Sequence, residues 1–488
     1  MVPNDVHRVL IRSRLRSFLG RSFRTLNPGR SLSSAHYVRA LCCTLERVAR
    51  GEVRRLIIEL PPRHLKSTIA SVAFPAWVLG RDPTKRIVCI SYGQDLAQSF
   101  GLKCRSLMQE PFYQANFPGL ALDPGKNAVA EYHTTQKGFR IATSMGGTLT
   151  GKGGDIVILD DVLKAQDTHS QTARDSAWQV YKETIATRLD DPKTGAIVVV
   201  GQRLHEDDLL GRLRQTGNWE VVSMPAITIE EQTFDLGDNM QYTRFPGEPL
   251  DPDRVGLEEL AAIKAEIGTL AFEAEYQQHP VLPGGNLVKL EWFKTYEKLL
   301  PRAQYEAVIQ SWDTAAIPGD SNDYTVCTTW GIIGNYVDLL DVHRQQCLYP
   351  EIVDAAVLLR KKWKPNLIVI EKAVTGLSLK PDLVKKGAPE ANWLSPEKGK
   401  VERMIAQSAK IEAGEVRLPK AAHWLEAFKA EVAAFPKGKY DDQVDSMSQA
   451  LRALDYRHHT IRHCSRFKGY GFTSGSKSAA FLSKNMCE

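Results

Sequence analysis

Five short apolar runs in the first half of the chain constrain its fold more than any other feature. They are RRLIIEL, RIVCISY, GFRIATS, DIVILDD and AIVVVGQ, and all lie between residues 54 and 202. Segments with a helical pattern, such as DLAQSFGLKCRSLMQE, separate them. Short continuous apolar strands that alternate with helices predict a mainly parallel sheet with helices on both faces. We therefore expect a doubly wound α/β fold in this part of the chain.

A second pattern begins near residue 303. EAVIQSWDTAA, YTVCTTWGII and NYVDLLDVHR are three strand-like segments joined by short loops, which predicts an antiparallel opening. A helix, IVDAAVLLRKKW, and a buried strand, NLIVIEKA, follow, and two further helices end in YDDQVDSMSQALRAL. The second half is therefore also predicted to be α/β, with a different strand order.

The length of 488 residues indicates two or three domains. The predicted organisation is a basic segment at 1–34, an α/β domain at 35–285 whose last part (about 226–285) is a connector, a second α/β domain at 286–454, and a basic, disordered tail at 455–488. Within the connector we expect a polar loop, FPGEPLDPDRVG, one helix, LEELAAIKAEIGTLAFEAEYQQ, and a linker, HPVLPGG.

Composition narrows the class of protein. No window approaches 18 uninterrupted apolar residues, so we expect no membrane span. None of the eight cysteines forms a CxxC or a Cys/His pair with metal spacing, which favours reduced thiols inside a cell. The net charge of +6 is concentrated at the ends, and residues 1–30 hold seven Arg and one Asp. Basic ends suit a polyanionic partner, but solvated and poorly ordered termini would look the same.

The stretch LIIELPPRHLKSTIA, residues 56–70, has the layout of a phosphate-binding loop. A strand precedes the loop, Lys66 is the cation for phosphate oxygens, Ser67 supplies a hydroxyl for Mg²⁺, and a helix follows. No glycine stands between Leu56 and Gly80, and an ordinary loop could show this pattern by chance. The predicted nucleotide contacts in the loop are Pro62, Arg63, His64, Leu65, Lys66, Ser67 and Thr68.

Two carboxylates further along support a nucleotide site. In GGDIVILDDVLK, four apolar residues run into Asp160 and Asp161, as in a Walker B strand. Asp160 is predicted to hold Mg²⁺ through water, and Asp161 to orient or activate the attacking water. Two adjacent carboxylates at the end of a buried strand are costly to desolvate unless a cation or hydrogen-bond donors contact them. The site therefore favours ATP with Mg²⁺ as its ligand.

The next strand, in AIVVVGQRLHEDDLLGRL, ends in polar residues that would lie beside Asp160 and Asp161. Gly201, Gln202 and Arg203 are candidates to sense the γ-phosphate, with Gln202 as a nucleotide contact. An ordinary loop before an acidic helix start is the alternative.

Acidic residues follow a comparable arrangement in the second half. Asp313 and Glu371 each end a predicted strand, and Asp441, Asp442 and Asp445 lie at the start of a predicted helix. Each feature alone is explained by a helix cap or by loop hydrogen bonds. Together they match an RNase H-like nuclease, in which two Mg²⁺ or Mn²⁺ ions neutralise converging carboxylates and stabilise the attacking and leaving oxygens. The predicted ligands are Asp313, Glu371 and Asp442, with Asp445 in reserve and Asp441 a weaker candidate.

DNA would be held mainly through its phosphates. Lys372, Lys380, Lys385 and Lys386 follow Glu371 and could line a DNA groove, although a solvated helix face explains them equally well.

Four motifs, PPRHLKS, TSMGGTLTGKGGDIVILDD, GQRLHEDDLLGRL and FEAEYQQHP, resemble the large terminase subunit of tailed phages, and the resemblance runs from about residue 35 to 454. It implies an ATPase that drives double-stranded DNA into a procapsid, joined to an endonuclease that cuts concatemeric DNA. It also implies a terminase small subunit and a portal protein as partners, a pentameric ring on the portal, and action in the cytoplasm of the bacterial host rather than in the mature virion. Arg63 corresponds to the arginine finger that this family supplies in cis.

Two positions depart from the family pattern. Many relatives have Gly where this chain has Leu65, so the loop backbone must be held without the freedom that glycine has at positive φ, and we expect an unusual backbone first at Leu65. Relatives often carry Thr-Arg-Trp where this chain reads Gln202-Arg203-Leu204. Two alternatives therefore stay open: a helicase-like remodeller whose C-terminal acids are structural, and an inactive DNA-binding prophage remnant.

Overall fold

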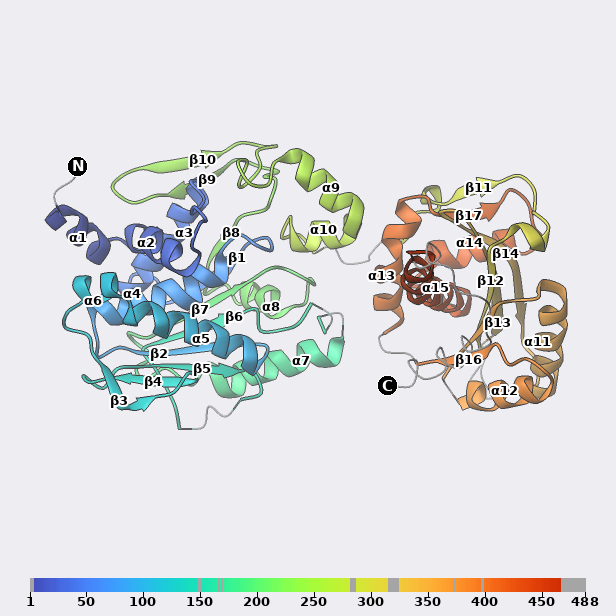
Figure 1. Ribbon diagram of the computed structural model, residues 1–488, viewed down its shortest axis with the longest axis horizontal. Coiled ribbons are helices and arrows are strands. Elements are labelled where there is room, and N and C mark those ends of the chain that lie inside the picture. Colours follow the sequence, from blue (N-terminus) through green and yellow to red (C-terminus); the bar gives the residue numbers. More distant parts are fainter. Residues whose placement is uncertain are drawn as a thin grey trace. The chain divides into compact units, whose positions relative to one another are not determined.

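The computed structural model describes residues 4–147, 151–165, 167–168, 170–280, 287–314, 324–372, 374–395 and 399–466. The chain divides into two compact units, Met1–Gly285 and Asn286–Glu488 (Figure 1). None of the helices in the described residues is long and apolar enough to cross a membrane.

The first unit is built on an eight-stranded sheet in the order β3-β4-β5-β2-β6-β7-β1-β8. Neighbouring strands are parallel from β5 to β8, and β3 and β4 form an antiparallel edge. The strands are β1 (Arg55–Glu59), β2 (Arg86–Ser91), β3 (Leu122–Asn127), β4 (Glu131–Thr134), β5 (Phe139–Ser144), β6 (Ile156–Asp160), β7 (Ala196–Gly201) and β8 (Glu220–Ser223). The prediction of a mainly parallel sheet from five apolar runs is confirmed.

Both faces of this sheet are buried because successive side chains of a strand point to opposite sides. Leu56 and Ile58 of β1 join one apolar cluster, whereas Ile57 joins another. The first cluster includes residues of α1 (Asn4–Ser13), α2 (Leu15–Leu26), α3 (His36–Ala49), the π-helix η1 (Thr68–Ala73), α4 (Phe74–Arg81), α5 (Gln94–Gln109) and α6 (Pro111–Asn116). The second includes residues of α7 (Gln171–Val180), η2 (Tyr181–Ile185) and α8 (Leu209–Gln215). The continuous apolar strands follow from this two-sided burial.

The basic segment at 1–34 is part of the folded unit over its described residues. Helix α2 buries Leu15, Phe18 and Leu19 in the core, and the ring of Phe18 lies 5.8 Å from that of Phe117. Arg21 and Arg24 are directed to the opposite, exposed side of the helix. A poorly ordered N-terminus is therefore the wrong alternative for residues 4–34, because the apolar positions of α2 recur at helical spacing.

The connector differs from its prediction in two respects. A short hairpin, β9 (Gln232–Asp235) and β10 (Gln241–Arg244), occupies a stretch too polar to be recognised as strands. The single predicted helix is two helices, α9 (Leu257–Ile267) and α10 (Thr269–Glu275), because Gly268 has a φ of 82° that ends α9. Residues 281–285 of the predicted linker lie outside the described residues.

The second unit contains a seven-stranded sheet in the order β11-β17-β14-β13-β12-β15-β16. The strands are β11 (Lys294–Tyr296), β12 (Ala307–Asp313), β13 (Thr325–Ile333), β14 (Tyr336–Gln345), β15 (Leu367–Glu371), β16 (Ala391–Leu394) and β17 (Val416–Pro419), with short helices η3 (Leu290–Trp292) and η4 (Arg302–Gln304). The antiparallel opening is confirmed, since β12, β13 and β14 pair in that way and β15 is parallel to β12.

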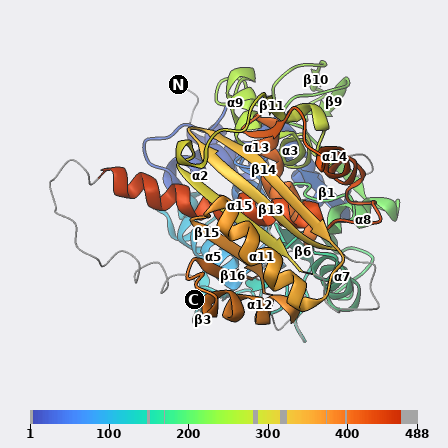
Figure 2. The ribbon, with the colours of Figure 1, turned by 90° about the vertical axis from the view of Figure 1, so that its right-hand side faces the viewer.

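Helices cover both faces of this second sheet (Figures 1 and 2). One face carries α11 (Tyr349–Trp363) and α12 (Val374–Lys385), and the other carries α15 (Asp442–Arg466), with α13 (Lys400–Glu412) against α15. Helix α14 (Leu425–Ala434) also contacts α15. Ser446 of α15 donates a hydrogen bond of 2.7 Å to the carbonyl of Ser311, which fixes the helix on β12. Helix α15 extends past residue 454 to Arg466, and the rest of the predicted tail, 467–488, lies outside the described residues.

Candidate active sites

The loop between β1 and η1 contains two non-glycine residues with left-handed backbone. Arg63 has a φ of 63° and Leu65 a φ of 62°, so the unusual backbone expected at Leu65 is present and Arg63 shares it. Such residues cost of order 1–3 kcal/mol each, and surrounding contacts must hold them in place. The side chain of Leu65 packs against the core cluster, and His64 between the two is buried. Residues that alternate between right- and left-handed backbone can turn successive N–H groups to one side, as anion-binding loops do.

His64 anchors this loop from inside. Its Nδ1 lies 2.8 Å from the carbonyl oxygen of Pro62, and its ring meets that of Tyr37 edge-on at 5.7 Å. Because a carbonyl only accepts, Nδ1 is the protonated nitrogen of a neutral imidazole. Burial lowers the pKa of His64 to about 4, so the ring is uncharged at neutral pH.

Lys66 reaches the ends of two neighbouring strands. Its ammonium lies 3.4 Å from Oε1 of Gln202 and 3.6 Å from Oδ2 of Asp161, and its side chain is 8% exposed. Residues that follow β1, β6 and β7 therefore meet at one point, although they are up to 136 positions apart in the chain. Of the other predicted loop contacts, Arg63 is exposed, and Pro62, Ser67 and Thr68 are half-buried.

Asp160 ends β6 in a buried position and accepts two hydroxyl hydrogen bonds. Ser67 donates to Oδ1 at 3.0 Å and Ser71 to Oδ2 at 2.6 Å. Burial, followed by the nearby charge of Asp161, raises the pKa of Asp160 to about 7. A carboxylate that is costly to ionise beside a serine hydroxyl is a donor set that fits Mg²⁺, whose charge would keep the group ionised.

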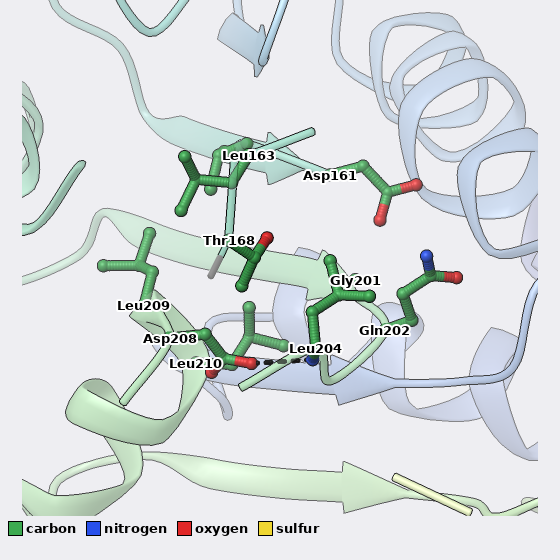
Figure 3. A pocket seen from close by; sticks show the side chains of 10 residues that line it. Asp161, Leu163, Thr168, Gly201, Gln202, Leu204, Asp208, Leu209 and Leu210 are labelled. Carbon is green, nitrogen blue, oxygen red and sulfur yellow. Dashed lines mark hydrogen bonds between the residues drawn. The ribbon is translucent and has the colours of Figure 1, made fainter. Parts of the chain in front are cut away.

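Asp161 lies between the ends of three strands. It has a φ of 46°, its N–H donates to the carbonyl of Val200, and its own carbonyl accepts from the N–H of Tyr92. The side chains of Asp161 and Gln202 lie on one side of a cavity that Leu163 and Leu209 line on the other (Figure 3). The left-handed backbone at Asp161 changes the direction of the chain, so the carboxylates of Asp160 and Asp161 point to different parts of the site.

Arg203 does not join Gln202 at this point. Its guanidinium is buried, 3.1 Å from Oδ1 of Asp208 and 3.6 Å from Oε1 of Glu59. Its backbone N–H donates to Oε1 of Gln278, which follows α10. Arg203 thus connects β1, β7 and the connector, and of the predicted sensor residues only Gln202 contacts Lys66.

A buried arginine that sequence reasoning missed lies behind the same site. Arg140, on β5, is fully buried, and one of its guanidinium nitrogens donates a 2.9 Å hydrogen bond to the carbonyl of Ser71. Ser71 therefore contacts Arg140 through its backbone and Asp160 through its hydroxyl. The available signal was a single Arg inside the apolar run GFRIATS, where a charge is expensive unless it serves another group.

The acids of the second unit meet at the edge where β12 and β15 end. Trp312 pairs with Ile370 in parallel register, so the next residues, Asp313 and Glu371, are neighbours. Helix α15 packs on β12 and places its first-turn acids beside them. Burial and then the charges of Asp445, Glu371 and Asp442 raise the pKa of Asp313 well above its ordinary value. The structure therefore brings all four predicted ligands together.

Two basic residues of α13 that were not predicted lie among these acids. Arg403 donates to Glu371 and to Asp445, each at 3.0 Å. Lys400 lies 2.8 Å from Asp445 and 2.7 Å from Asp441. Lys400 and Arg403 are three positions apart in KGKVERM, so they share one helix face, which was the signal available in the sequence.

Asp442 differs from its neighbours because no basic side chain contacts it at ion-pair distance in the described residues. Its Oδ2 is buried and has no hydrogen-bond partner there, and burial, followed by the charge of Glu431, raises its pKa to about 6. An orphaned carboxylate oxygen beside Asp313 is a donor set that fits a divalent cation. Among the described residues, however, no three acids stand ready as a ligand group, since Arg403 and Lys400 hold Glu371 and Asp445.

The contacts of the lysines that follow Glu371 partly favour the alternative in which these side chains form a solvated helix face and not a DNA groove. Lys385 pairs with Asp382 at 3.6 Å, and Lys386 with Asp354 at 3.3 Å. Lys380 lies 4.3 Å over the ring of Trp393.

Comparisons with known proteins agree with this arrangement. The family "Terminase large subunit, T4likevirus-type, N-terminal" matches residues 57–293, and "Terminase RNaseH-like domain" matches residues 310–454, so together they cover most of the chain. The large terminase subunit of Enterobacteria phage T3 is 24% identical over 255 residues, which are 48% of this chain and 42% of that protein. The chain therefore matches less than half the length of that relative.

The same fold occurs in a solved structure. The large terminase of a thermophilic bacteriophage, in its second crystal form, matches with a TM-score of 0.51 and 9% identity, over 87% of this chain and 99% of that one. The first unit is thus a P-loop ATPase fold and the second an RNase H-like fold. On these grounds the chain belongs to the phage terminase large subunit family.

Proposed function

We propose that this chain is an ATP-driven motor that packages viral double-stranded DNA and a metal-dependent endonuclease that cuts concatemeric DNA. The observation that carries the proposal is the meeting of Lys66 with Asp161 and Gln202, one residue from the Ser67–Asp160 hydrogen bond. Large terminases as a family combine an ATPase with a nuclease, and both folds are present here.

In the first unit, we assign Ser67 and Asp160 to Mg²⁺, and the loop from Pro62 to Thr68 to the phosphates of ATP. The metal would neutralise charge on the phosphate oxygens. Lys66 would contact the β- and γ-phosphates, Gln202 would contact the nucleotide from β7, and Asp161 would accept a hydrogen bond from the attacking water. Arg63, exposed and on the same loop, would reach the transferring phosphoryl group as a cation.

In the second unit, we assign Asp313, Glu371 and Asp442 as metal ligands, with Asp445 as a further one. Mg²⁺ or Mn²⁺ would stabilise the attacking and leaving oxygens of a phosphodiester. The raised pKa of Asp313 and the unpartnered buried oxygen of Asp442 support this role over a purely structural one, because a structural cluster would give each buried carboxylate a donor or a cation. This argument weighs against the helicase-like alternative.

Paired substitutions test the assignment. Lys66→Ala should abolish DNA-stimulated ATP hydrolysis and leave metal-dependent cutting of plasmid DNA intact, whereas Asp313→Ala should do the reverse. Lys126→Ala on β3 and Asp354→Ala on α11 are exposed matched controls that should keep both activities. If neither test variant lost its activity, the site assignments would be wrong. If wild-type protein hydrolysed ATP only at background, the inactive-remnant alternative would hold instead.

The partners follow from the family and are part of the proposal. They are double-stranded DNA, the terminase small subunit and the portal of the procapsid, on which we propose a pentameric ring in the cytoplasm of the bacterial host. Co-sedimentation of the chain with purified portal, with and without ATP, tests this assembly.

A further inference from the structure

Arg403 bridges two acids that come from different elements of the second unit. One guanidinium nitrogen lies 3.0 Å from Oε1 of Glu371, at the end of β15, and another 3.0 Å from Oδ1 of Asp445, in the first turn of α15. The side chains are 7%, 15% and 2% exposed, respectively. A planar guanidinium with two hydrogen bonds in a nearly dry site is held in a single orientation.

Lys400 completes a pair of cations on the same face of α13. Its ammonium lies 2.8 Å from Oδ2 of Asp445, the oxygen that Arg403 does not contact, and 2.7 Å from Oδ1 of Asp441. Both oxygens of Asp445 are therefore engaged by protein cations. The pair contacts Glu371, Asp441 and Asp445, while Asp442 keeps a buried oxygen without a hydrogen-bond partner in the described residues.

We propose that Arg403, assisted by Lys400, occupies the position of a divalent cation between Glu371 and Asp445 and competes with metal for these two acids. The proposal rests on the nuclease function proposed above and adds the regulation of its metal site. A guanidinium at hydrogen-bond distance from both carboxylates occupies lone pairs that a metal ion would use, and its positive charge repels a divalent cation brought to the same groups. We therefore expect Asp313 and Asp442 to take metal more tightly than Glu371 and Asp445, which Arg403 contacts.

The sign of one substitution distinguishes this role from a merely structural one. Arg403→Gln removes the competing charge, so nucleotide-free full-length protein should bind Mn²⁺ at its weaker site about tenfold more tightly. If Arg403 only positioned the acids, the same substitution would weaken Mn²⁺ binding. Titration calorimetry with Mn²⁺, or the electron paramagnetic resonance signal of free Mn²⁺, gives affinity and stoichiometry without any cleavage assay.

Matched variants separate effects on stability from effects on Mn²⁺ affinity. Arg417 of β17 holds the buried Asp338 at 2.6 and 2.9 Å, away from the acidic cluster, so Arg417→Gln should destabilise the unit without changing Mn²⁺ affinity. Lys400→Gln should tighten Mn²⁺ binding in the same direction as Arg403→Gln, and Arg403→Lys, which keeps the charge but not the planar fork, should have an affinity between those of Arg403→Gln and the wild type. Either Lys400→Gln or Arg403→Gln suffices if the other variant fails to fold.

Two failures can be told apart. If Mn²⁺ binds and is lost in Asp313→Asn, but Arg403→Gln and Lys400→Gln leave its affinity unchanged or lower it, the competition is refuted and the nuclease site stands. If wild-type Mn²⁺ binding is indifferent to Asp313→Asn, the nuclease assignment itself fails.

Discussion

At the scale of single residues, the loop between β1 and η1 depends on side chains where phosphate-binding loops usually depend on glycine. Leu65 holds its left-handed backbone by packing against the core, and His64 holds the loop by a hydrogen bond to Pro62. A loop secured in this way stores strain that the folded unit must offset. Its stability should therefore respond to any change that charges or removes its buried anchor.

The pH dependence of His64 follows from its burial. The pKa of the ring falls from 6.5 to about 4 on folding, so the unfolded chain binds a proton first as the pH drops. The contribution of this pKa difference to the free energy of unfolding is complete above pH 6.5. It is lost progressively down to about pH 4, by about 2 to 3 kcal/mol. His64→Asn keeps a donor for Pro62 but cannot titrate. We expect its unfolding free energy to fall less steeply than that of the wild type between these pH values.

Denaturant unfolding at several pH values from 4 to 8 measures these slopes. His7→Asn, at an exposed position of α1, should follow the wild-type slope. Equal slopes for the wild type and His64→Asn would show that the imidazole is not neutral and buried as described.

At the scale of elements, the π-helix η1 links the loop that precedes it to a buried charge. Its wider turn lets Ser71 meet Asp160 with its hydroxyl and Arg140 with its carbonyl. Nε and one terminal nitrogen of Arg140 are buried and lack hydrogen-bond partners in the described residues. A buried guanidinium with nitrogens that lack hydrogen-bond partners contributes little to stability. We therefore infer that its positive charge acts on the carboxylate of Asp160.

Arg140→Met should separate these two effects. Since Met has a similar length and no charge to desolvate, we expect the melting temperature to stay within a few degrees of wild type. Without the positive charge of Arg140, which interacts electrostatically with Asp160, the pKa of Asp160 should rise, so affinity for Mg·ATP should fall by about tenfold at pH 7 and recover at pH 9.

Calorimetric titration with a non-hydrolysable Mg·ATP analogue at both pH values checks this expectation. Arg105→Met is the matched control, because Arg105 of α5 is bonded only to the carbonyl of Asn127 among the described residues. A loss of affinity that is the same at pH 7 and pH 9 would assign Arg140 a packing role instead.

At the scale of the whole molecule, each unit has its own sheet and its own buried clusters. Proteins with separate cores unfold in separate transitions. We expect calorimetry of the full chain to show two transitions, of which a Mg·ATP analogue raises only one, because a ligand stabilises the unit that binds it. In Lys66→Ala the nucleotide-dependent shift should disappear while both transitions remain. A single transition that shifts as a whole with nucleotide would contradict this independence.

Much of this architecture could be predicted from the sequence alone, because it depends on local patterns. Continuous apolar runs fix which segments are two-sided strands, and acids at the ends of such strands, as at Asp160 and Asp313, must face solvent, donors or cations. Motifs around Lys66 and Asp160 likewise carry the family resemblance that the comparisons confirmed. Helix ends were less certain, and Gly268 divided a helix that the apolar pattern alone would continue.

What only the tertiary structure decided concerns contacts between distant segments. The positive φ of Leu65 is held by core packing, the partner of Arg140 comes from a helix 69 positions earlier, and Arg403 reaches acids 32 and 42 positions away on either side. A sequence shows that a charge is present but not which opposite charge will meet it, since that depends on how strands and helices stack. The sequence therefore pointed to the acidic clusters, whereas the fold decided which basic residues contact the groups around them.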